Sequence, residues 1–257
     1  MTLLNVLNAE MLKIRRTVAL PMVVLGPALI ALFIFVMGVN APFSTLNRNG
    51  VSGEWAALTR ASMRFWASLM LPLLITLETA LLAGLEHSEG QWKSLLARPL
   101  PRWNFYAVKL VIGLVLIAIS SAVLVLGILL NGAILPRVQP ELVFALPIPW
   151  LDIAGKGAEV FCLAFLLLVI QNWVAVRWKS FSVPVGVGIV GLVTGFFMFV
   201  AGQQGMKELQ LFPWSLPILV LGSRTSLDVG SGLIFSGIVG IFVAAAGCWD
   251  FCRREVH

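Results

Sequence analysis

The sequence predicts an all-α membrane protein with six transmembrane helices, and three observations support this fold class. The chain has 257 residues, of which 59% are hydrophobic and only 12% are charged. A soluble domain carries about 25% charged residues, so this chain has too few charges to cover a water-facing surface. Its mean hydropathy is +0.96, and six apolar segments are close to the roughly 20 residues that a helical span needs. We therefore expect residues 1–257 to form a single transmembrane domain.

The expected spans are long apolar runs with few charges. They cover residues 17–39, 65–85, 110–135, 158–176, 184–202 and 232–249. Residues 212–222 are also apolar, but this segment is too short to cross a bilayer and contains Pro213 and Pro217. We expect it to be a re-entrant outer segment or a surface segment before the last span, because irregular backbone at membrane depth must be covered by protein.

Two segments outside the spans have the apolar spacing of amphipathic helices. In residues 1–16, the apolar side chains Leu3, Leu7, Met11 and Ile14 recur at helical spacing, between polar residues. This pattern predicts an interfacial helix before the first span, with a frayed tail as the alternative. Residues 54–65 show a similar apolar side and predict a second surface helix.

The distribution of basic residues predicts that both termini are cytoplasmic. With six spans and an inside N-terminus, 11 of the 18 basic residues lie in short segments next to the inner span ends: Lys13, Arg15, Arg16, Lys93, Arg98, Arg102, Lys109, Arg177, Lys179, Arg253 and Arg254. The outer segments are longer and hold the other seven. This asymmetry follows the positive-inside rule.

The segment after the second span contains a further predicted helix, residues 88–98. Ser88 followed by Gln91 fits a capping box, and Pro99 and Pro101 end the helix because proline cannot continue the hydrogen-bond ladder. Trp92, Leu95 and Leu96 form its apolar stripe. Such a helix either lies on the lipid surface or docks on a cytoplasmic partner.

The residue inventory argues against several functional classes. The three cysteines include no C-x-x-C pair, and the two histidines, His87 and His257, lie outside the apolar segments, so we expect no metal site. The three aspartates, Asp152, Asp228 and Asp250, lie at span borders and form no catalytic motif. We expect no catalytic residue. The net charge of +6 favours contact with anionic lipid over nucleic acid.

Three motifs, in this order, resemble the membrane subunit of type 2 ATP-binding-cassette (ABC) exporters of the bacterial lantibiotic-immunity, bacitracin-resistance and drug-export kind. They are AEMLKIRRT (9–17) before a proline-containing span, the acidic-then-basic stretch from Glu78 through EGQWKSLLARP to Arg102, and FPWSLP (212–217) before the last span. The resemblance covers essentially the whole chain. It implies a permease in the bacterial cytoplasmic membrane that moves an amphipathic substrate or peptide outward, working with cytoplasmic ATPase subunits and a second permease copy or paralogue.

The resemblance also implies roles for particular residues. The 88–98 helix would be the coupling helix that docks on the ATPase, with contacts from Glu86, Glu89, Gln91, Trp92, Lys93, Leu96 and Arg98. The N-terminal helix would be a connecting helix and second ATPase contact, through Glu10, Lys13 and Arg15. The FPWSLP region would correspond to outer re-entrant helices.

The sequence itself shows no phosphate-binding loop. A Walker A motif needs G-K-[ST], whereas Lys93 and Lys179 follow tryptophan and Lys156 precedes glycine. ATP and Mg²⁺ are therefore expected on the partner ATPase and not on this chain.

Glu78 is the one charged residue deep inside an expected span. Charges in the membrane interior usually face the protein interior or a cavity. Glu78 is therefore a candidate for a transport pathway or an interface, with Gln171, Asn172 or Arg177 as candidate partners; the alternative is a carboxylate that reaches the membrane surface or stays protonated. A secondary transporter or channel-like protein that uses Glu78 is the second functional hypothesis.

Overall fold

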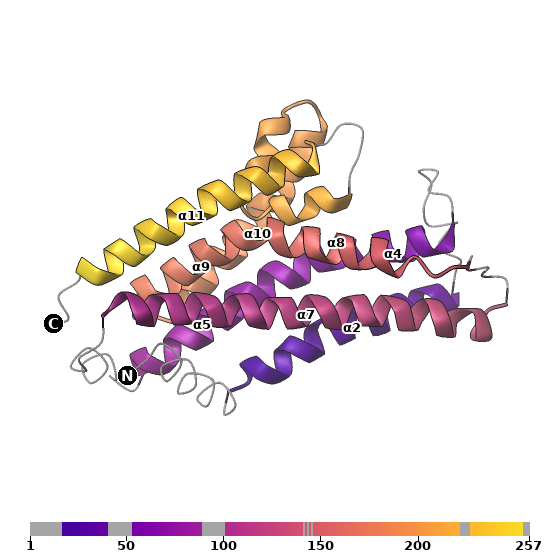
Figure 1. Cartoon of the computed structure of the whole chain (residues 1–257), viewed down its shortest axis with the longest axis horizontal. Helices are drawn as coiled ribbons and strands as arrows, with labels where there is room; N and C mark the ends of the chain where they lie inside the picture. The colour runs from indigo at the N-terminus through magenta and orange to yellow at the C-terminus, as the bar shows by residue number, and fades with distance from the viewer. Residues whose placement is uncertain are drawn as a thin grey trace.

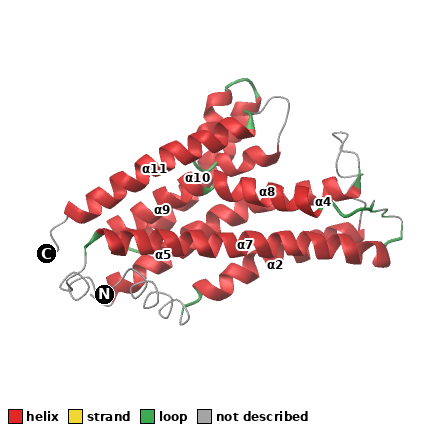
Figure 2. Cartoon of the chain, viewed as in Figure 1, coloured by secondary structure: helices red, strands yellow, loops and turns green. Residues whose placement is uncertain are grey.

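A computed structural model describes residues 17–40, 53–88, 101–140, 142, 144, 146–221 and 227–253. Within these ranges the protein consists of helices joined by turns and loops, without strands (Figure 2). The side chains of residues 85–88 are not described.

Six helical segments are long and apolar enough to cross a membrane, which confirms the predicted number of spans. The first is α2 (Ala19–Asn40) and the third is α7 (Trp103–Val138). The second combines α4 (Glu54–Phe65), the π-helix η1 (Trp66–Met70) and α5 (Leu71–Ser88). The fourth combines α8 (Trp150–Leu163) and α9 (Phe165–Arg177). The fifth and sixth are α10 (Ser182–Gln203) and α11 (Val229–Arg253).

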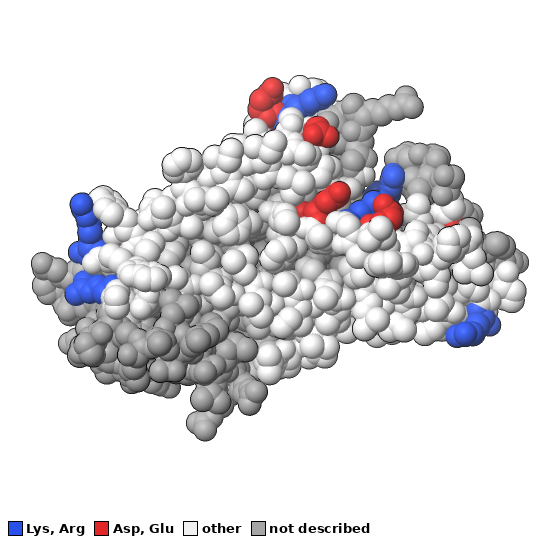
Figure 3. All heavy atoms as spheres, viewed as in Figure 1, with Lys and Arg blue, Asp and Glu red and all other residues white. Residues whose placement is uncertain are grey.

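The spans run up and down, so the bundle has two ends (Figure 1). The proximal end is defined by the span ends at Ala19, Ser88, Trp103, Arg177, Ser182 and Arg253. The distal end is defined by Asn40, Glu54, Val138, Trp150, Gln203 and Val229. Figure 3 shows visible charged atoms of described residues at the left, near the proximal end, and in the upper and right-hand part of the view, with a wide uncharged band between these two groups. Large apolar side chains of α2, α10 and α11 are exposed in this band, as expected of a surface that contacts lipid.

The second span differs from its prediction. Residues 54–65 are helical as expected, but they continue directly into the span and do not form a separate surface helix. Trp55 and Leu58, on the predicted apolar side, are only 7% and 0% exposed. Trp55 makes an edge-to-face ring contact with Phe144. The physical reason is that this apolar side packs on neighbouring protein segments, so it is not available to a lipid surface.

Other span boundaries extend beyond their predictions. The third span begins at Trp103 and not at residue 110, and the fourth begins at Trp150 and not at residue 158. Both extensions contain charged or polar residues, which hydropathy alone assigns to loops. A helix continues past the hydrocarbon layer because its backbone hydrogen bonds are internal and do not depend on apolar side chains.

The proline in the first span is matched by a hydroxyl on the third. Pro27 lies inside α2 and has no N–H, so it cannot donate to the carbonyl of Val23 four residues earlier. The Ser120 hydroxyl of α7 donates to that carbonyl at 3.0 Å, and Ser120 is completely buried. α7 therefore satisfies a backbone group that the proline leaves unpaired in the membrane interior.

The fourth span is interrupted by a turn at Ala164, between α8 and α9. The buried Ser236 of α11 lies against this turn. Its hydroxyl lies 3.1 Å from the carbonyl oxygens of both Cys162 and Leu163, and it accepts a hydrogen bond from the Leu166 N–H at 3.3 Å. A Cβ on Gly240, one turn later, would come within 2.6 Å of the Phe165 ring. The small residues of the sixth span therefore pack within the chain, against the interrupted fourth span.

The segment before the last span is a compact, buried element. It contains two short 3-10 helices, η2 (Lys207–Leu211) and η3 (Leu216–Leu221). Leu216 and Leu219 are fully buried, so this part of the segment is covered by protein, and its placement as a re-entrant or a surface segment stays a prediction. Trp214 fills the space beside two glycines of α10: a Cβ on Gly195 would lie 2.6 Å from the Trp214 Cβ, and one on Gly191 would overlap the indole ring.

Candidate functional site

The expected coupling segment is bracketed by two spans at the proximal end. α5 ends at Ser88 and α7 begins at Trp103. Glu86 lies in the last turns of α5, but its side chain is among those not described. The other expected coupling residues lie outside the described residues, as does the connecting helix: Glu89, Gln91, Trp92, Lys93, Leu96, Arg98, Glu10, Lys13 and Arg15. The structure therefore describes the helix ends on either side of this segment, at Ser88 and Trp103, and not the contacts of the segment itself.

Lys109 connects the two spans on either side of that segment. Its side chain is 2% exposed, and its Nζ donates to the Leu82 carbonyl of α5 at 2.6 Å. The sequence placed Lys109 directly before a span that begins at residue 110, whereas α7 begins at Trp103 and Lys109 is covered by protein. A buried ammonium needs such partners because an unpaired buried charge is costly. The contact ties the last turns of α5 to the first turns of α7.

Asp250 forms a second connection, between α9 and α11. Its Oδ2 accepts a hydrogen bond from the Trp173 Nε1 at 3.0 Å and lies 3.7 Å from the Arg177 Nε. At the start of α7, the Arg102 guanidinium donates to the Cys252 carbonyl of α11 at 3.3 Å. Polar contacts therefore link α5 with α7, α7 with α11 and α9 with α11 at the proximal end. Displacement of one span end would be passed to its neighbours through these contacts.

Glu78 lies in α5 and is completely buried. Neither of its carboxylate oxygens has a hydrogen-bond partner among the described residues. Glu78 therefore faces other residues of the chain, and its role in a transport pathway or an interface stays a prediction. Glu78 lies ten residues before Ser88, where α5 ends, or roughly 15 Å along the helix axis.

Gln171 and Asn172 are buried as well, at 0% and 3% exposure, but the structure pairs neither with Glu78. Gln171 Nε2 donates to the Thr76 hydroxyl at 3.1 Å. A Cβ on Gly188 of α10 would overlap Thr76 and would lie 2.7 Å from Gln171 Nε2, so α5, α9 and α10 meet closely at this point. The expected contact of Glu78 with Gln171 or Asn172 is not formed by hydrogen bonding, because Gln171 faces Thr76 instead. Arg177, the third expected partner, lies beside Asp250.

Sequence reasoning missed Lys109, Thr76 and Asp250 as members of the polar network. Lys109 and Asp250 carried a signal, since each is a charge beside an apolar run. Thr76 carried none, because an isolated threonine commonly bonds its own helix; here its hydroxyl lies 2.7 Å from the Pro72 carbonyl. Its contact with Gln171 depends on how α5 and α9 are rotated against each other.

The described residues hold no group of three or more histidine, cysteine, aspartate or glutamate side chains that could bind a metal ion. Cys162, Cys248 and Cys252 are free thiols. The polar network described above consists of hydrogen bonds and one ion pair between helices. Its chemistry suits the mechanical connection of spans.

Comparison with known proteins identifies the kind of membrane protein. A family model described as "ABC-2 family transporter protein" matches residues 6–195, which are 190 of the 257 residues. The match includes the first four spans, most of the fifth and the segment between α5 and α7. No curated protein matches the chain.

Proposed function

The chain belongs to the ABC-2 family of transporter proteins, and from this membership we propose that it is the permease subunit of an exporter whose energy comes from separate ATPase subunits. The observation that carries the proposal is the family match over residues 6–195 together with six membrane-spanning helices. The family is a membrane component of ABC transporters, so ATP and Mg²⁺ belong to the partner. The proposed cargo is an amphipathic molecule or peptide, moved outward from the cytoplasm or inner leaflet.

We place the ATPase contact on residues 88–98, with Glu86 at the edge and the N-terminal helix as a second contact. Support comes from the anchors of this segment. Lys109 ties α5 to α7, and Arg102 ties α7 to α11, immediately beside it. Movement of the docked segment would therefore displace three spans together. No catalytic residue is needed in this chain for such coupling.

The test begins with affinity purification of the protein, co-expressed with its gene neighbours, followed by an ATPase assay. We expect a stoichiometric ATPase that is lost when residues 88–98 are deleted. Trp92→Ala and charge reversal at Glu86 or Glu89 should abolish stimulation of the ATPase and leave membrane insertion intact. Trp178→Ala is the matched control, because Trp178 is an exposed tryptophan at the proximal end but on the α9–α10 connection. Normal ATPase stimulation in Trp92→Ala would overturn the proposed docking site. Purification of the protein as an oligomer without an ATPase would overturn the proposal that it is an ABC exporter.

We further propose that the proximal end faces the cytoplasm of a bacterial cell and that two permease chains, identical or paralogous, form the working unit. The basis for the orientation is the positive-inside distribution of basic residues. Cysteine-accessibility labelling tests it: a cysteine at Lys179 should react only after a membrane-permeant reagent is used, and one at Arg137 should react with an impermeant reagent.

A second candidate function rests on Glu78. A buried carboxylate without a hydrogen-bond partner among the described residues is typical of ion-coupled pathways. Glu78→Gln separates the two functions. In an ATP-driven exporter the variant keeps ATP-dependent export, whereas in a secondary transporter it loses transport that is driven by an ion gradient.

A further inference from the structure

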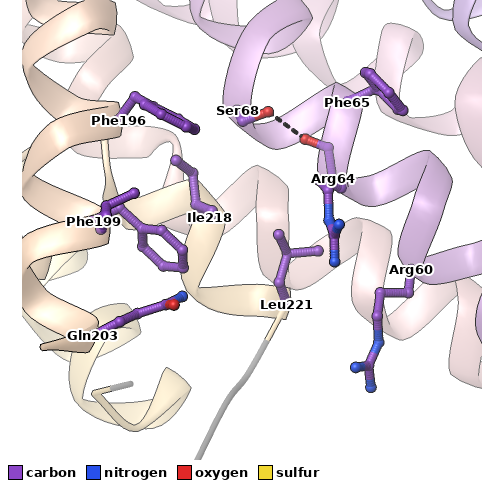
Figure 4. A pocket seen from close by; sticks show the side chains of 10 residues that line it. Arg60, Arg64, Phe65, Ser68, Phe196, Phe199, Gln203, Ile218 and Leu221 are labelled. Atoms are coloured by element: carbon purple, nitrogen blue, oxygen red, sulfur yellow. Dashed lines mark hydrogen bonds between the residues drawn. The ribbon is translucent and has the colours of Figure 1, made fainter. Parts of the chain in front are cut away.

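A cavity of about 510 Å³ opens at the distal end between the second span, α10 and η3. Arg60 and Arg64 line it from α4, Phe196, Phe199 and Gln203 from α10, and Ile218 from η3 (Figure 4). Its volume lies within the range of small-molecule sites, about 300–1,000 Å³. None of the sequence motifs discussed above points to this cavity, since its walls come from three separate parts of the chain.

Two positive charges without described ion-pair partners stand side by side in this cavity. Arg60 and Arg64 are four residues apart in one helix, which places them on the same face. The ion pairs among the described residues join Lys156 to Asp152 and Arg177 to Asp250, and neither includes these arginines. Adjacent like charges repel each other, so an anion bound between them would relieve the repulsion. The planar guanidinium group matches the oxygens of phosphate particularly well.

The lining of the cavity changes from polar to apolar along the membrane normal. In Figure 4, Gln203 and Arg60 lie toward one end, whereas Phe196 and Phe65 lie toward the other. Arg64 is 22 residues before Glu86, the first charged residue after the apolar run of this span, a distance of roughly 33 Å along a helix and close to the thickness of the hydrocarbon layer. The arginines therefore lie at the level of lipid headgroups. Phe196 lies seven residues before Gln203, or roughly 10 Å deeper.

We propose that this cavity binds an amphiphile with a phosphate headgroup and an alkyl chain. Arg60 and Arg64 hold the phosphate, Gln203 donates to a headgroup oxygen, and the chain lies along Phe196, Phe199 and Ile218 toward the membrane interior. The inference concerns binding at the distal end and does not depend on ATP-driven export, so it stands or falls separately from the proposed function.

The test uses the full chain purified in a neutral maltoside detergent and measures binding by calorimetric titration. Dodecyl phosphate is the probe, inorganic phosphate tests the headgroup alone, and dodecyl phosphocholine tests a chain with a zwitterionic headgroup. Dodecyl phosphate should bind at least about tenfold more tightly than either comparator, because only it combines the chain with a fully accessible phosphate. Equal binding of inorganic phosphate or dodecyl phosphocholine would overturn the proposal.

A double variant, Arg60→Gln with Arg64→Gln, is compared with a control variant, Arg137→Gln. Arg137 is also an arginine of the distal end but lies in the last turn of α7, outside the cavity. The double variant should lose about tenfold or more in affinity for dodecyl phosphate, and the control should bind as the unmodified protein does. Unchanged affinity in the double variant would overturn the assignment.

A second measurement needs no variant and therefore does not depend on how well the double variant folds. An alkyl phosphate with a photoreactive diazirine near the chain end is crosslinked to the unmodified protein, and the labelled peptides are mapped. Labelling should concentrate on Phe196, Phe199 and Ile218, and labelling confined to other residues would overturn the proposal. Lipid extracted from the purified protein then identifies the source. Enrichment of an acidic phospholipid that disappears in the double variant indicates a resident lipid, and its absence alongside dodecyl phosphate binding indicates an exchanging amphiphile.

Discussion

The two ends of the bundle use their charged residues in different ways. At the proximal end, Lys109, Arg177 and Asp250 each make a polar contact with another span. At the distal end, Arg60 and Arg64 line an open cavity and make no ion pair with described residues, and the described ion-pair partner of Lys156 is Asp152, one turn away in the same helix. The proximal end is therefore built to move as a unit, and the distal end is built to leave space. The first property suits a site that receives force, and the second suits a site that receives a ligand.

The largest expected effect tests the close packing of the proximal half. Gly188→Ala places a methyl group where it overlaps Thr76 and crowds Gln171, which should lower the free energy of unfolding by about 1–3 kcal/mol. Gly186→Ala is the matched control, because no atom lies within 4 Å of its added Cβ. Thermal unfolding in detergent measures both. Equal stability of the two variants would show that α5, α9 and α10 are not packed as described.

The next effect tests whether the distal half is loosely connected throughout. Ser236→Ala removes the hydroxyl that lies against the turn at Ala164 and leaves buried backbone groups there unpaired. We expect the free energy of unfolding to fall by about 1–2 kcal/mol. Ser231→Ala, at an exposed position five residues earlier in α11, should change stability little. If both variants unfold alike, the interrupted fourth span does not depend on the sixth.

A smaller loss of stability is expected when the polar contact between α9 and α11 at the proximal end is weakened. Asp250→Asn removes the negative charge beside Arg177 and weakens the hydrogen bond from Trp173. The site is partly exposed, so solvent reduces the effect to about 1 kcal/mol. Urea titration in detergent, followed by tryptophan fluorescence, measures it. If a second change, Arg177→Gln, restores the stability, the loss in Asp250→Asn comes from the broken ion pair and not from a general disturbance of the fold.

The smallest effect belongs to the distal ion pair. Asp152→Asn breaks the contact with Lys156, whose atoms are 3.2 Å apart, but the two side chains are 62% and 37% exposed. Exposed pairs within one helix contribute little, so stability should change by less than about 0.5 kcal/mol. The same titration applied to Asp152→Asn and Asp250→Asn compares the two ends directly. A larger loss in Asp152→Asn would reverse the comparison.

Two interruptions of helices separate what could be predicted from what could not. Pro27 is visible in the sequence. Because proline has no N–H, it predicts that the carbonyl of Val23, four residues earlier, lacks its helical hydrogen bond. Its partner, Ser120, lies 97 positions from Val23 and cannot be identified from local pattern. The turn at Ala164 has neither proline nor glycine at that position, and it is matched by Ser236 on the sixth span. Polar side chains that serve a distant backbone look, in sequence, like ordinary residues of an apolar helix.

The same limit applies to the charged residues. The sequence placed Arg60 and Arg64 on an outer surface helix, and Lys109 at the edge of a span. Both arginines instead face a cavity whose opposite wall comes from α10, more than 130 residues later. Lys109 is buried because α7 begins before it and α5 covers it. Glu78 lies closer to its expectation: its depth inside an apolar run favoured a position that faces protein, and it is completely buried.

The sequence by itself determined the number of spans, their approximate places and the family of the protein. These properties are local, because each transmembrane helix satisfies its own backbone and its apolar composition alone decides whether it enters the bilayer. Only the tertiary structure decided which polar groups meet, where the fourth span breaks and where a cavity opens. Those properties depend on how helices rotate and approach one another, and small residues such as Gly188 and Gly240 set that approach through partners far away in the chain.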